Sequence, residues 1–230
     1  MLSIYREESP LATEVRRIAS KLRVAGTERG IKSVMVTSAS LGEGKSTAAA
    51  YLAIACSRYR NTKTVLVDFD LRRPRVHELF EVRRKRGIAE ILSRRSPLKA
   101  CLKGTRYRNL RIVTSGRDSH KNPSGLMNSS HIEQLFAELR FYFDLIIIDA
   151  PPVIPVSDPL LLSPELDGAL FVVKAGKTQK PVIQRALQLL KDARVETLGI
   201  ILNNMHHVLP YYYDYSFYHY QYSSETEDLE

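Results

Sequence analysis

Residues 37–47 combine glycine, lysine and hydroxyl side chains at the spacing of a phosphate-binding loop. The segment reads Thr-Ser-Ala-Ser-Leu-Gly-Glu-Gly-Lys-Ser-Thr, between an apolar run at 34–36 that predicts a strand and an alanine-rich run at 48–55 that predicts a helix. Glycines let backbone N–H groups turn toward phosphate oxygens, and the positive end of the helix faces the same anion. Lys45 can reach the β- and γ-phosphates, and the Ser46 hydroxyl can bind Mg²⁺. The nucleotide-binding residues predicted here are Leu41, Gly42, Glu43, Gly44, Lys45, Ser46 and Thr47.

One position of this loop departs from the usual motif. Ala39 stands where the first glycine is expected. A glycine-rich turn between strand and helix, with a solvated lysine, is therefore the competing interpretation, and other parts of the chain must support a nucleotide site.

Three aspartates supply that support. Asp68 and Asp70 end an apolar run that begins at residue 64, and Asp149 ends the run 145–148. Ligands of parallel sheets collect at the carboxyl ends of strands, so we expect these carboxylates near the phosphate loop. Alternate positions on a strand point the same way, which favours a shared site for Asp68 and Asp70 over two helix caps. Asp149 is placed to hold Mg²⁺ directly or through water, whereas Asp158, at the start of a short helix, is ambiguous.

Strands and helices alternate along the chain. Apolar runs at 34–36, 64–70, 110–113, 145–148, 169–173 and 198–202 predict strands, the last two of them buried, and 10–25, 132–143 and 182–193 predict helices. Residues 75–105 are predicted to be helical and basic, and 116–125 to form a polar loop. This order predicts an α/β fold: a doubly wound, mostly parallel sheet flanked by helices, as in P-loop NTPases.

The chain divides into three parts on this interpretation. Residues 1–30 form a helical segment that docks on the domain or on a neighbour, with Leu11, Val15, Ile18 and Leu22 on its apolar face and Gly26 and Gly30 ending it. Residues 31–207 form the nucleotide-binding domain. Residues 208–230 form a flexible tyrosine-rich tail.

Composition excludes several classes of protein. The 230 residues include two cysteines, which are too few for a disulfide framework and fit no metal spacing. No apolar run is long enough to span a membrane, and residues 1–8 lack the apolar core of a signal peptide. A reducing cytoplasm is the expected location.

The net charge of +9 is concentrated in the middle of the chain. Such a region could face nucleic acid or an anionic membrane, or it could be a solvated basic surface. Its residues are Arg83, Arg84, Lys85, Arg86, Arg94, Arg95, Lys99, Lys103, Arg106, Arg108 and Arg111.

Seven of the twelve tyrosines lie in the C-terminal segment, before an acidic end. A stacking surface and an aggregating edge strand are two interpretations. The third is a substrate, in which phenol hydroxyls are carried to an ATP site on the same or a neighbouring chain. These candidate phosphoacceptors are Tyr211, Tyr212, Tyr213, Tyr215, Tyr218, Tyr220 and Tyr222.

The chain resembles the bacterial tyrosine kinases (BY-kinases) of capsule and exopolysaccharide biosynthesis over nearly its whole length. Residues 38–47 are similar to the family's Walker A motif, 65–74 (Val-Leu-Val-Asp-Phe-Asp-Leu-Arg-Arg-Pro) to its Walker A′ motif and 145–153 (Leu-Ile-Ile-Ile-Asp-Ala-Pro-Pro-Val) to its Walker B motif. The tyrosine cluster is similar to the family's autophosphorylation tail.

The resemblance implies an ATP- and Mg²⁺-dependent protein tyrosine autokinase. Lys45 would bind the β- and γ-phosphates, and Ser46, Asp70 and Asp149 would hold Mg²⁺. Asp68 would orient or deprotonate the attacking tyrosine hydroxyl. The catalytic residues implied are thus Lys45, Asp68, Asp70 and Asp149.

The resemblance also implies partners. Family members act with a transmembrane activator of the polysaccharide co-polymerase type, which would recruit the kinase to the inner face of the membrane. A homo-oligomer is implied by the family's Glu-x-x-Arg-x-x-Arg motif, in which Glu14 and Arg17 match and Ser20 replaces the last arginine. Exogenous protein substrates stay open, and nucleic acid is not an expected partner.

Two other functions remain as alternatives. A partitioning-type P-loop ATPase of the ParA and MinD group would bind DNA or membrane, but its signature lysine position holds Ser40 here. A silent adaptor would bind nucleotide and offer its tail to another kinase, although Lys45 and three acidic candidates argue against that interpretation.

Overall fold

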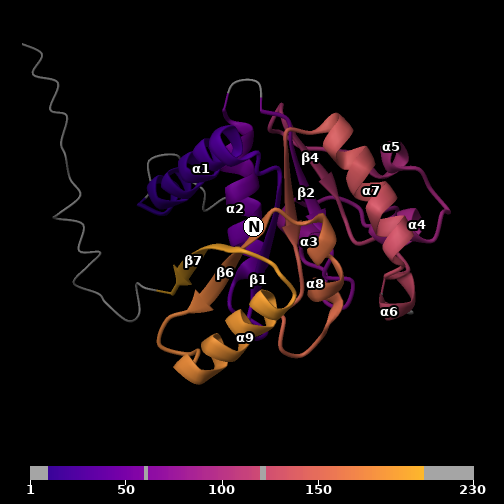
Figure 1. Ribbon diagram of the computed structural model, residues 1–230. Helices are drawn as coiled ribbons and strands as arrows, with labels where there is room; N and C mark the ends of the chain where they lie inside the picture. Colours follow the sequence, from indigo (N-terminus) through magenta and orange to yellow (C-terminus); the bar gives the residue numbers. More distant parts are fainter. Residues whose placement is uncertain (1–9, 60–61, 120–122, 205–230) are drawn as a thin grey trace, which may run out of the picture.

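A seven-stranded, mostly parallel sheet lies between two layers of helices (Figure 1). The structure is a computed structural model, and it describes residues 10–59, 62–119 and 123–204. The strand order is β3-β4-β2-β5-β1-β6-β7, with β3 alone antiparallel to its neighbour. The predicted α/β fold with a doubly wound sheet is therefore confirmed.

The strands are those predicted, with one addition. β3 was not predicted, because two residues carry no periodic signal. The bounds are β1 Ser33–Ser38, β2 Thr64–Asp68, β3 Lys103–Gly104, β4 Leu110–Val113, β5 Leu145–Asp149, β6 Gly168–Lys174 and β7 Thr197–Asn203.

The helices connect these strands and cover both faces of the sheet. Their bounds are α1 Pro10–Arg29, α2 Lys45–Ser57, α3 Val76–Leu79, α4 Ile88–Leu92, α5 Leu98–Cys101, α6 Pro123–Leu126, α7 Ser129–Tyr142, α8 Asp158–Leu161, the 3-10 helix η2 Ser163–Glu165, and α9 Lys180–Asp192.

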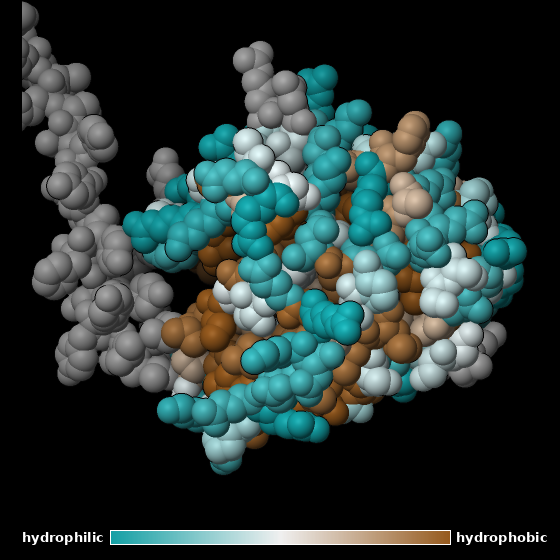
Figure 2. All heavy atoms as spheres, viewed as in Figure 1, coloured by the Kyte–Doolittle hydropathy of each residue, from teal (hydrophilic) through white to brown (hydrophobic). Residues whose placement is uncertain are grey.

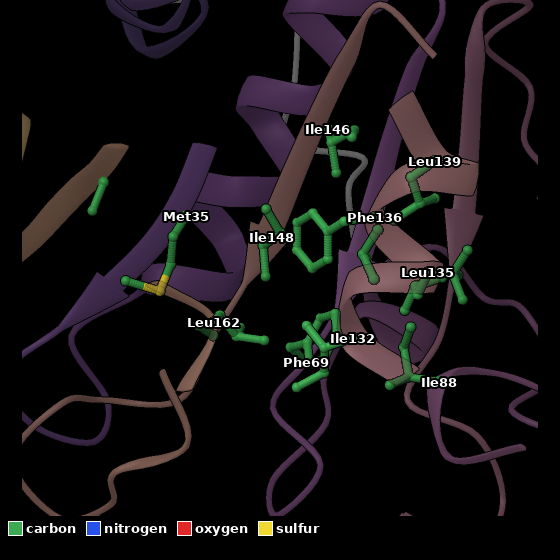
Figure 3. Packing of buried hydrophobic residues seen from close by; sticks show 14 of the residues in the cluster. Met35, Phe69, Ile88, Ile132, Leu135, Phe136, Leu139, Ile146, Ile148 and Leu162 are labelled. Atoms are coloured by element: carbon green, nitrogen blue, oxygen red, sulfur yellow. The ribbon is translucent and has the colours of Figure 1, made fainter. Parts of the chain in front are cut away.

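Two hydrophobic clusters fill the two interfaces between sheet and helices. One lies under α1 and α2, where the alanine-rich sequence of α2 permits close packing on the central strands. The other lies under α4, α7 and α9, and Figure 3 shows Phe136 of α7 among Ile146, Ile148 and Phe69. All five residues of β5 are buried, as expected for a strand covered on both faces. These clusters fix the strand ends that carry the aspartates.

Helix α1 corrects one prediction. It runs through Gly26 and stops at Arg29, because Gly30 adopts the left-handed φ of 70° that ends a helix. Its buried residues include Ala12 and Ala19 as well as Val15, whereas Leu11 is exposed. The small alanines let α1 pack closely against α2, so Leu11 was wrongly assigned to the packed face.

Three further predictions need correction. Residues 75–105 form three short helices with loops, since Gly87 and Pro97 start new helices and Glu81 and Arg94 have positive φ. The predicted loop at 116–125 contains the start of α6. β7 is not buried like β6, because it lies at the edge of the sheet that the described residues form.

The molecular surface differs between regions. Figure 2 shows hydrophilic side chains over most of the visible face and hydrophobic surface around β6, β7 and α9. Ile200 and Leu202 of β7 are about half exposed. Among the described residues, none of the helices has the length and apolar character needed to cross a membrane.

Gly87 offers a test of the packing between α4 and β4. The amides of Ile88 and Ala89 donate to Thr114 and Ser115 carbonyls at 2.9 Å, and a Cβ at Gly87 would lie 1.9 Å from the Thr114 oxygen. Gly87→Ala should therefore lower the free energy of unfolding by about 2–4 kcal/mol in urea titrations.

Gly104→Ala is the matched control for this substitution. A Cβ at Gly104 meets no atom within 4 Å, so a change below about 0.5 kcal/mol is expected. Equal losses of unfolding free energy in Gly87→Ala and Gly104→Ala would contradict the close approach of Gly87 to the Thr114 carbonyl.

Candidate active site

The segment between β1 and α2 forms a loop that curls at two glycines. Gly42 and Gly44 have φ of 77° and 95°, a region that favours glycine, and Lys45 begins α2. Ala39 is fully buried and is absent from the positive-φ residues among those described. The position of the first motif glycine therefore does not require glycine in this chain.

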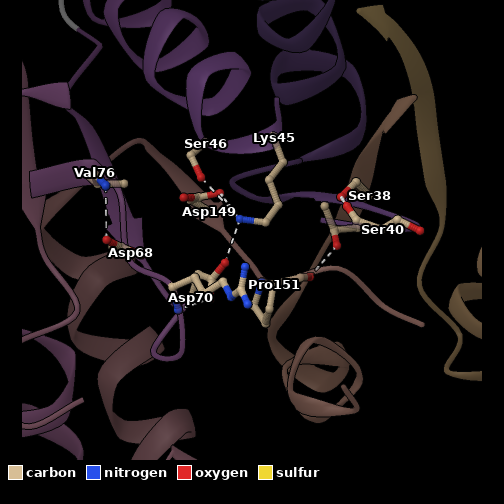
Figure 4. A network of polar contacts seen from close by, with 11 residues as sticks. Ser38, Ser40, Lys45, Ser46, Asp68, Asp70, Val76, Asp149 and Pro151 are labelled. Carbon is tan, nitrogen blue, oxygen red and sulfur yellow. Dashed lines mark hydrogen bonds and ion pairs between the residues drawn. The ribbon is translucent and has the colours of Figure 1, made fainter. Parts of the chain in front are cut away.

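Lys45 lies at the centre of the site (Figure 4). Its Nζ contacts Asp70 Oδ2 at 2.7 Å and Asp149 Oδ1 at 3.6 Å, and lies 3.2 Å from the Ser46 hydroxyl. Burial lowers the pKa of Lys45, but the charges of Asp149 and Asp70 outweigh it, so the pKa is raised. Lys45 is thus a buried cation held between two carboxylates that come from different strand ends.

Asp149 is fully buried at the end of β5. Neither of its carboxylate oxygens accepts a hydrogen bond by geometry among the described residues, although Lys45 pairs with one of them. Burial raises its pKa, while the Lys45 charge and the nearby Ser46 hydroxyl oppose this rise. The site therefore contains a buried carboxylate with unused acceptor capacity.

Asp68 lies apart from the contacts of Lys45. Its Oδ2 accepts from the Val76 amide at 3.3 Å, and its Oδ1 has no partner among the described residues. Burial raises its pKa well above the ordinary value, and the charges of Asp149 and Asp70 add to this effect. A raised pKa in a cleft of acidic groups is typical of a group that handles protons.

The donor set fits a magnesium ion that is shared with phosphate. Mg²⁺ takes one or two carboxylates and completes its shell with phosphate oxygens and water. The oxygens of Asp149, which accept no hydrogen bond among the described residues, lie beside the Ser46 hydroxyl and Asp70, which could supply further oxygen ligands. No group of three acidic, histidine or cysteine side chains in the described chain is arranged to bind a metal alone.

Residues far along the chain hold the loop in place. Glu43 is buried; its Oε2 accepts from the Ser40 amide at 2.7 Å, and its Oε1 accepts from the Thr178 hydroxyl. Asn203, at the end of β7, donates from Nδ2 to the Glu43 carbonyl at 2.8 Å. A Cβ at Gly44 would lie 2.1 Å from that nitrogen. Sequence reasoning missed Thr178 and Asn203, because neither belongs to a local motif.

Asn203→Ala is expected to weaken nucleotide binding. The substitution removes the hydrogen bond to the Glu43 carbonyl, so the loop must be ordered by the nucleotide instead. We expect KM for the nucleotide to rise about tenfold, which corresponds to about 1.4 kcal/mol, with kcat little changed. Asn109→Ala is the control, because it removes a similar bond to the Ser57 carbonyl elsewhere. An unchanged KM in Asn203→Ala would contradict the role of Asn203 in holding the phosphate loop.

A second contact fixes the loop that follows β2. Arg72 donates from Nε and Nη2 to the two carboxylate oxygens of Asp158 at 3.0 and 3.4 Å, and from Nη2 to the Ser124 hydroxyl. The hydrogen bonds to Asp158 raise the pKa of Arg72. The Asp70 Oδ1 in the same loop accepts from the Arg73 amide at 2.9 Å. Asp158 therefore has a structural partner.

Of the remaining residues predicted to bind nucleotide, some are buried in the site and others are exposed. Ser46 is buried beside Lys45, whereas Leu41 and Thr47 are exposed. The tyrosine tail at 208–230 lies outside the described residues.

Comparisons with known proteins place the chain among P-loop NTPases and tyrosine-protein kinases. A family profile described as "ParA: NUBPL iron-transfer P-loop NTPase" matches residues 30–224. The tyrosine-protein kinase YwqD of Bacillus subtilis (strain 168) is 32% identical over 203 residues, which cover 88% of this chain and 85% of that protein.

Two solved structures are similar to the fold described above. The crystal structure of the chimerical protein CapA2B2 matches with a TM-score of 0.81 at 30% identity, covering 87% of this chain and 88% of that one. The kinase domain of the Escherichia coli tyrosine kinase ETK matches with a TM-score of 0.81 at 28% identity, covering 88% and 78%.

Proposed function

This chain belongs to the bacterial tyrosine-protein kinases, which share the ParA-type P-loop NTPase fold, and we propose that it phosphorylates the tyrosines of its own C-terminal segment. The observation that carries the proposal is Lys45 between Asp70 and Asp149, in a site whose third aspartate, Asp68, contacts no charged side chain within the part of the chain that the structure describes.

Lys45 would exchange partners when ATP binds. In the structure it neutralises Asp70 and Asp149. The γ-phosphate is the stronger attractor for a lysine in a phosphate loop, whose backbone amides and helix end also face the anion. Lys45 would then stabilise charge on the transferred phosphoryl group.

Once Lys45 leaves them, the two carboxylates are available for a divalent ion. Asp149, Ser46 and Asp70 would hold Mg²⁺, whose charge would offset that of the phosphate oxygens. Asp68 would accept the proton of the attacking phenol, whose ordinary pKa of about 10 keeps it protonated at neutral pH. Its raised pKa makes Asp68 a better proton acceptor than an ordinary aspartate.

The tail supplies the substrate in this proposal. Its seven tyrosines are the phosphoacceptors, and transfer takes place between subunits of a homo-oligomer. Glu14 and Arg17, which match the family's assembly motif, form an ion pair with each other on the exposed face of α1. Other substrates would be exogenous proteins that present a tyrosine in the same way.

The biological setting follows from the family. We propose that the chain regulates synthesis or export of a capsular polysaccharide or exopolysaccharide. A transmembrane activator of the polysaccharide co-polymerase type would recruit this cytoplasmic kinase to the membrane.

Phosphate mapping tests the proposal. Purified protein is incubated with Mg²⁺ and ATP, and modified residues are located by mass spectrometry, with Lys45→Met in parallel. We expect phosphate on Tyr211–Tyr222 in the wild type and none in the variant. If the wild type is silent, the assay is repeated with the cytoplasmic segment of a candidate activator.

A partitioning-type ATPase gives a different result. It would release inorganic phosphate from ATP, leave the tyrosines unmodified, and retain DNA or vesicles when ATP is present. Ser40 occupies the position of that group's signature lysine, and its amide donates to Glu43. ATP hydrolysis without phosphotyrosine, with or without the activator segment, would replace the kinase proposal by this one.

A further inference from the structure

A basic pocket lies at the edge of the sheet opposite the active site. Three of its residues, Lys63, Asn109 and Phe143, come just before β2, β4 and β5, whereas Asp68 and Asp149 end β2 and β5. Five strand residues separate the two edges by about 16 Å. The pocket has a volume of about 410 Å³ and is lined by Lys63, Lys99, Leu102, Arg108, Asn109, Arg111, Tyr142 and Phe143.

Four cations line this pocket, and the one carboxylate bonded at its rim, Asp144, accepts from the Lys63 backbone amide at 2.8 Å and pairs with none of the four side-chain cations among the described residues. Among the described residues, neither the two lysines nor the two arginines form an ion pair. Arg111 donates from Nη1 to the Arg108 and Leu110 carbonyls, which holds its guanidinium against the wall. The Lys99 ammonium lies 5.5 Å from the centre of the Tyr142 ring. The pocket therefore attracts an anion.

The remaining wall of the pocket is apolar. Leu102, Tyr142 and Phe143 come from the segments that follow α5 and end α7. A ligand that fills the pocket needs a flat apolar part for these side chains and a phosphate for the cations. Arginine is suited to such phosphates because its N–H groups match two oxygens at once.

We infer that this pocket binds phosphotyrosine of the chain's own C-terminal segment. The inference rests on the proposed function, which generates an aromatic phosphate on every acceptor tyrosine. Glu225, Glu227, Asp228 and Glu230 of the same segment add charge complementarity. Each phosphate adds about −1.5 to −2 charges. Repulsion from Asp68 and Asp149 would then drive a phosphorylated tail out of the active site.

The length of the segment permits this contact. The acceptor tyrosines end at Tyr222, and residues 205–222 can extend to about 60 Å, whereas β7 and β4 are five strand positions apart, about 24 Å. A pocket on the same chain or on a neighbour is therefore within reach. Binding there would hold the phosphorylated tail away from the catalytic aspartates and leave the site open for another tail.

Peptide binding tests the inference without any kinase step. Seven synthetic peptides of residues 211–230, each with one phosphotyrosine, and the unmodified peptide are titrated by fluorescence anisotropy. The host is the full chain with all seven tail tyrosines replaced by phenylalanine, so its own tail cannot compete. We expect at least one phosphopeptide to bind tenfold or more tightly than the unmodified peptide.

Variants locate the binding. Lys99→Ala/Arg108→Ala should weaken the phosphopeptide tenfold or more, and Lys63→Ala should weaken it severalfold. The control Lys177→Ala/Lys191→Ala, which removes two exposed cations elsewhere, should change it less than twofold. Phenyl phosphate should compete better than inorganic phosphate, because it also contacts the apolar wall.

Three results would overturn the inference. They are equal binding of modified and unmodified peptides, equal loss in the pocket and control variants, and stronger binding of a single-stranded DNA 20-mer, which would assign the pocket to nucleic acid. Because the peptides are synthetic, a failed phosphate-mapping experiment would refute the autokinase proposal and leave the binding result independent.

Discussion

Replacing Asp68 by asparagine is expected to abolish tyrosine phosphorylation and to make the folded chain more stable. Asp68 is fully buried, and its pKa is raised first by burial and then by the charges of Asp149 and Asp70. Its ionised form is therefore less favourable in the folded chain than in water. Asparagine removes the charge and keeps an oxygen that can accept from the Val76 amide. We expect a gain of about 1–3 kcal/mol in the free energy of unfolding at pH 7.

The pH dependence of this gain follows from the direction of the pKa shift. The folded chain holds the Asp68 proton more tightly than the unfolded chain, whose pKa is near the ordinary 3.8. Stability of the wild type therefore falls as pH rises from about 4 through the folded pKa. The advantage of Asp68→Asn should vanish near pH 4 and grow as pH rises toward the folded pKa, as followed by urea titrations from pH 4 upward.

Activity should change in the opposite direction. Loss of a general base costs about 10²–10⁴-fold in rate, measured here as phosphotyrosine formed per minute. The control Asp192→Asn removes a surface carboxylate that accepts from Gln188, its one partner among the described residues, and should leave both stability and rate nearly unchanged. A destabilised but active Asp68→Asn would show that this carboxylate serves the fold. A stabilised, inactive variant is the expected signature of an active-site residue.

The site residues that could be predicted from the sequence are those that belong to a recognisable local pattern of residues. Lys45 follows a glycine loop between strand and helix, and Asp68 and Asp149 each follow an apolar run, so their common edge follows from the parallel sheet. The strands were predictable for the same reason, since short runs of Ile, Val and Leu, as in β5, are typical of buried parallel strands. The site residues and the strands could both be predicted, because each depends on a pattern of residues that lie close together in the sequence.

The parts that sequence missed depend on tertiary contacts. Thr178 and Asn203 reach Glu43 across 135 and 160 residues of chain. Glu90 was not singled out from the sequence, yet its buried carboxylate accepts from the amides of Gly87 and Arg117 and so fixes a loop. The apolar sequence of β7 predicts burial, but its edge position leaves it exposed. These contacts and the edge position of β7 depend on residues far apart in the chain, so no local sequence pattern predicts them.

Replacing Lys45 by methionine is expected to destabilise the chain as well as to stop phosphate transfer. The substitution leaves Asp70 and Asp149 buried without their cation. Breaking a buried ion pair from one side costs about 3–5 kcal/mol. Without the Lys45 charge, which lowers the pKa of Asp149, that carboxylate would take up a proton more readily, so the loss should be larger at pH 8 than at pH 5. Thermal and urea unfolding measure it, with the exposed Lys177→Met as control.

This destabilisation complicates any activity assay of Lys45→Met, and a second substitution resolves the difficulty. Lys45→Met/Asp70→Asn removes one of the two charges that the lysine neutralised, so we expect it to recover 1 kcal/mol or more, roughly, of the lost stability. Activity should stay absent, because the double variant still lacks a cation for the phosphates. Recovery of phosphotyrosine along with stability would mean that Lys45 acts only as a structural counter-ion. Recovery of stability alone would assign the lost activity to the missing phosphate contact, since the fold is then intact.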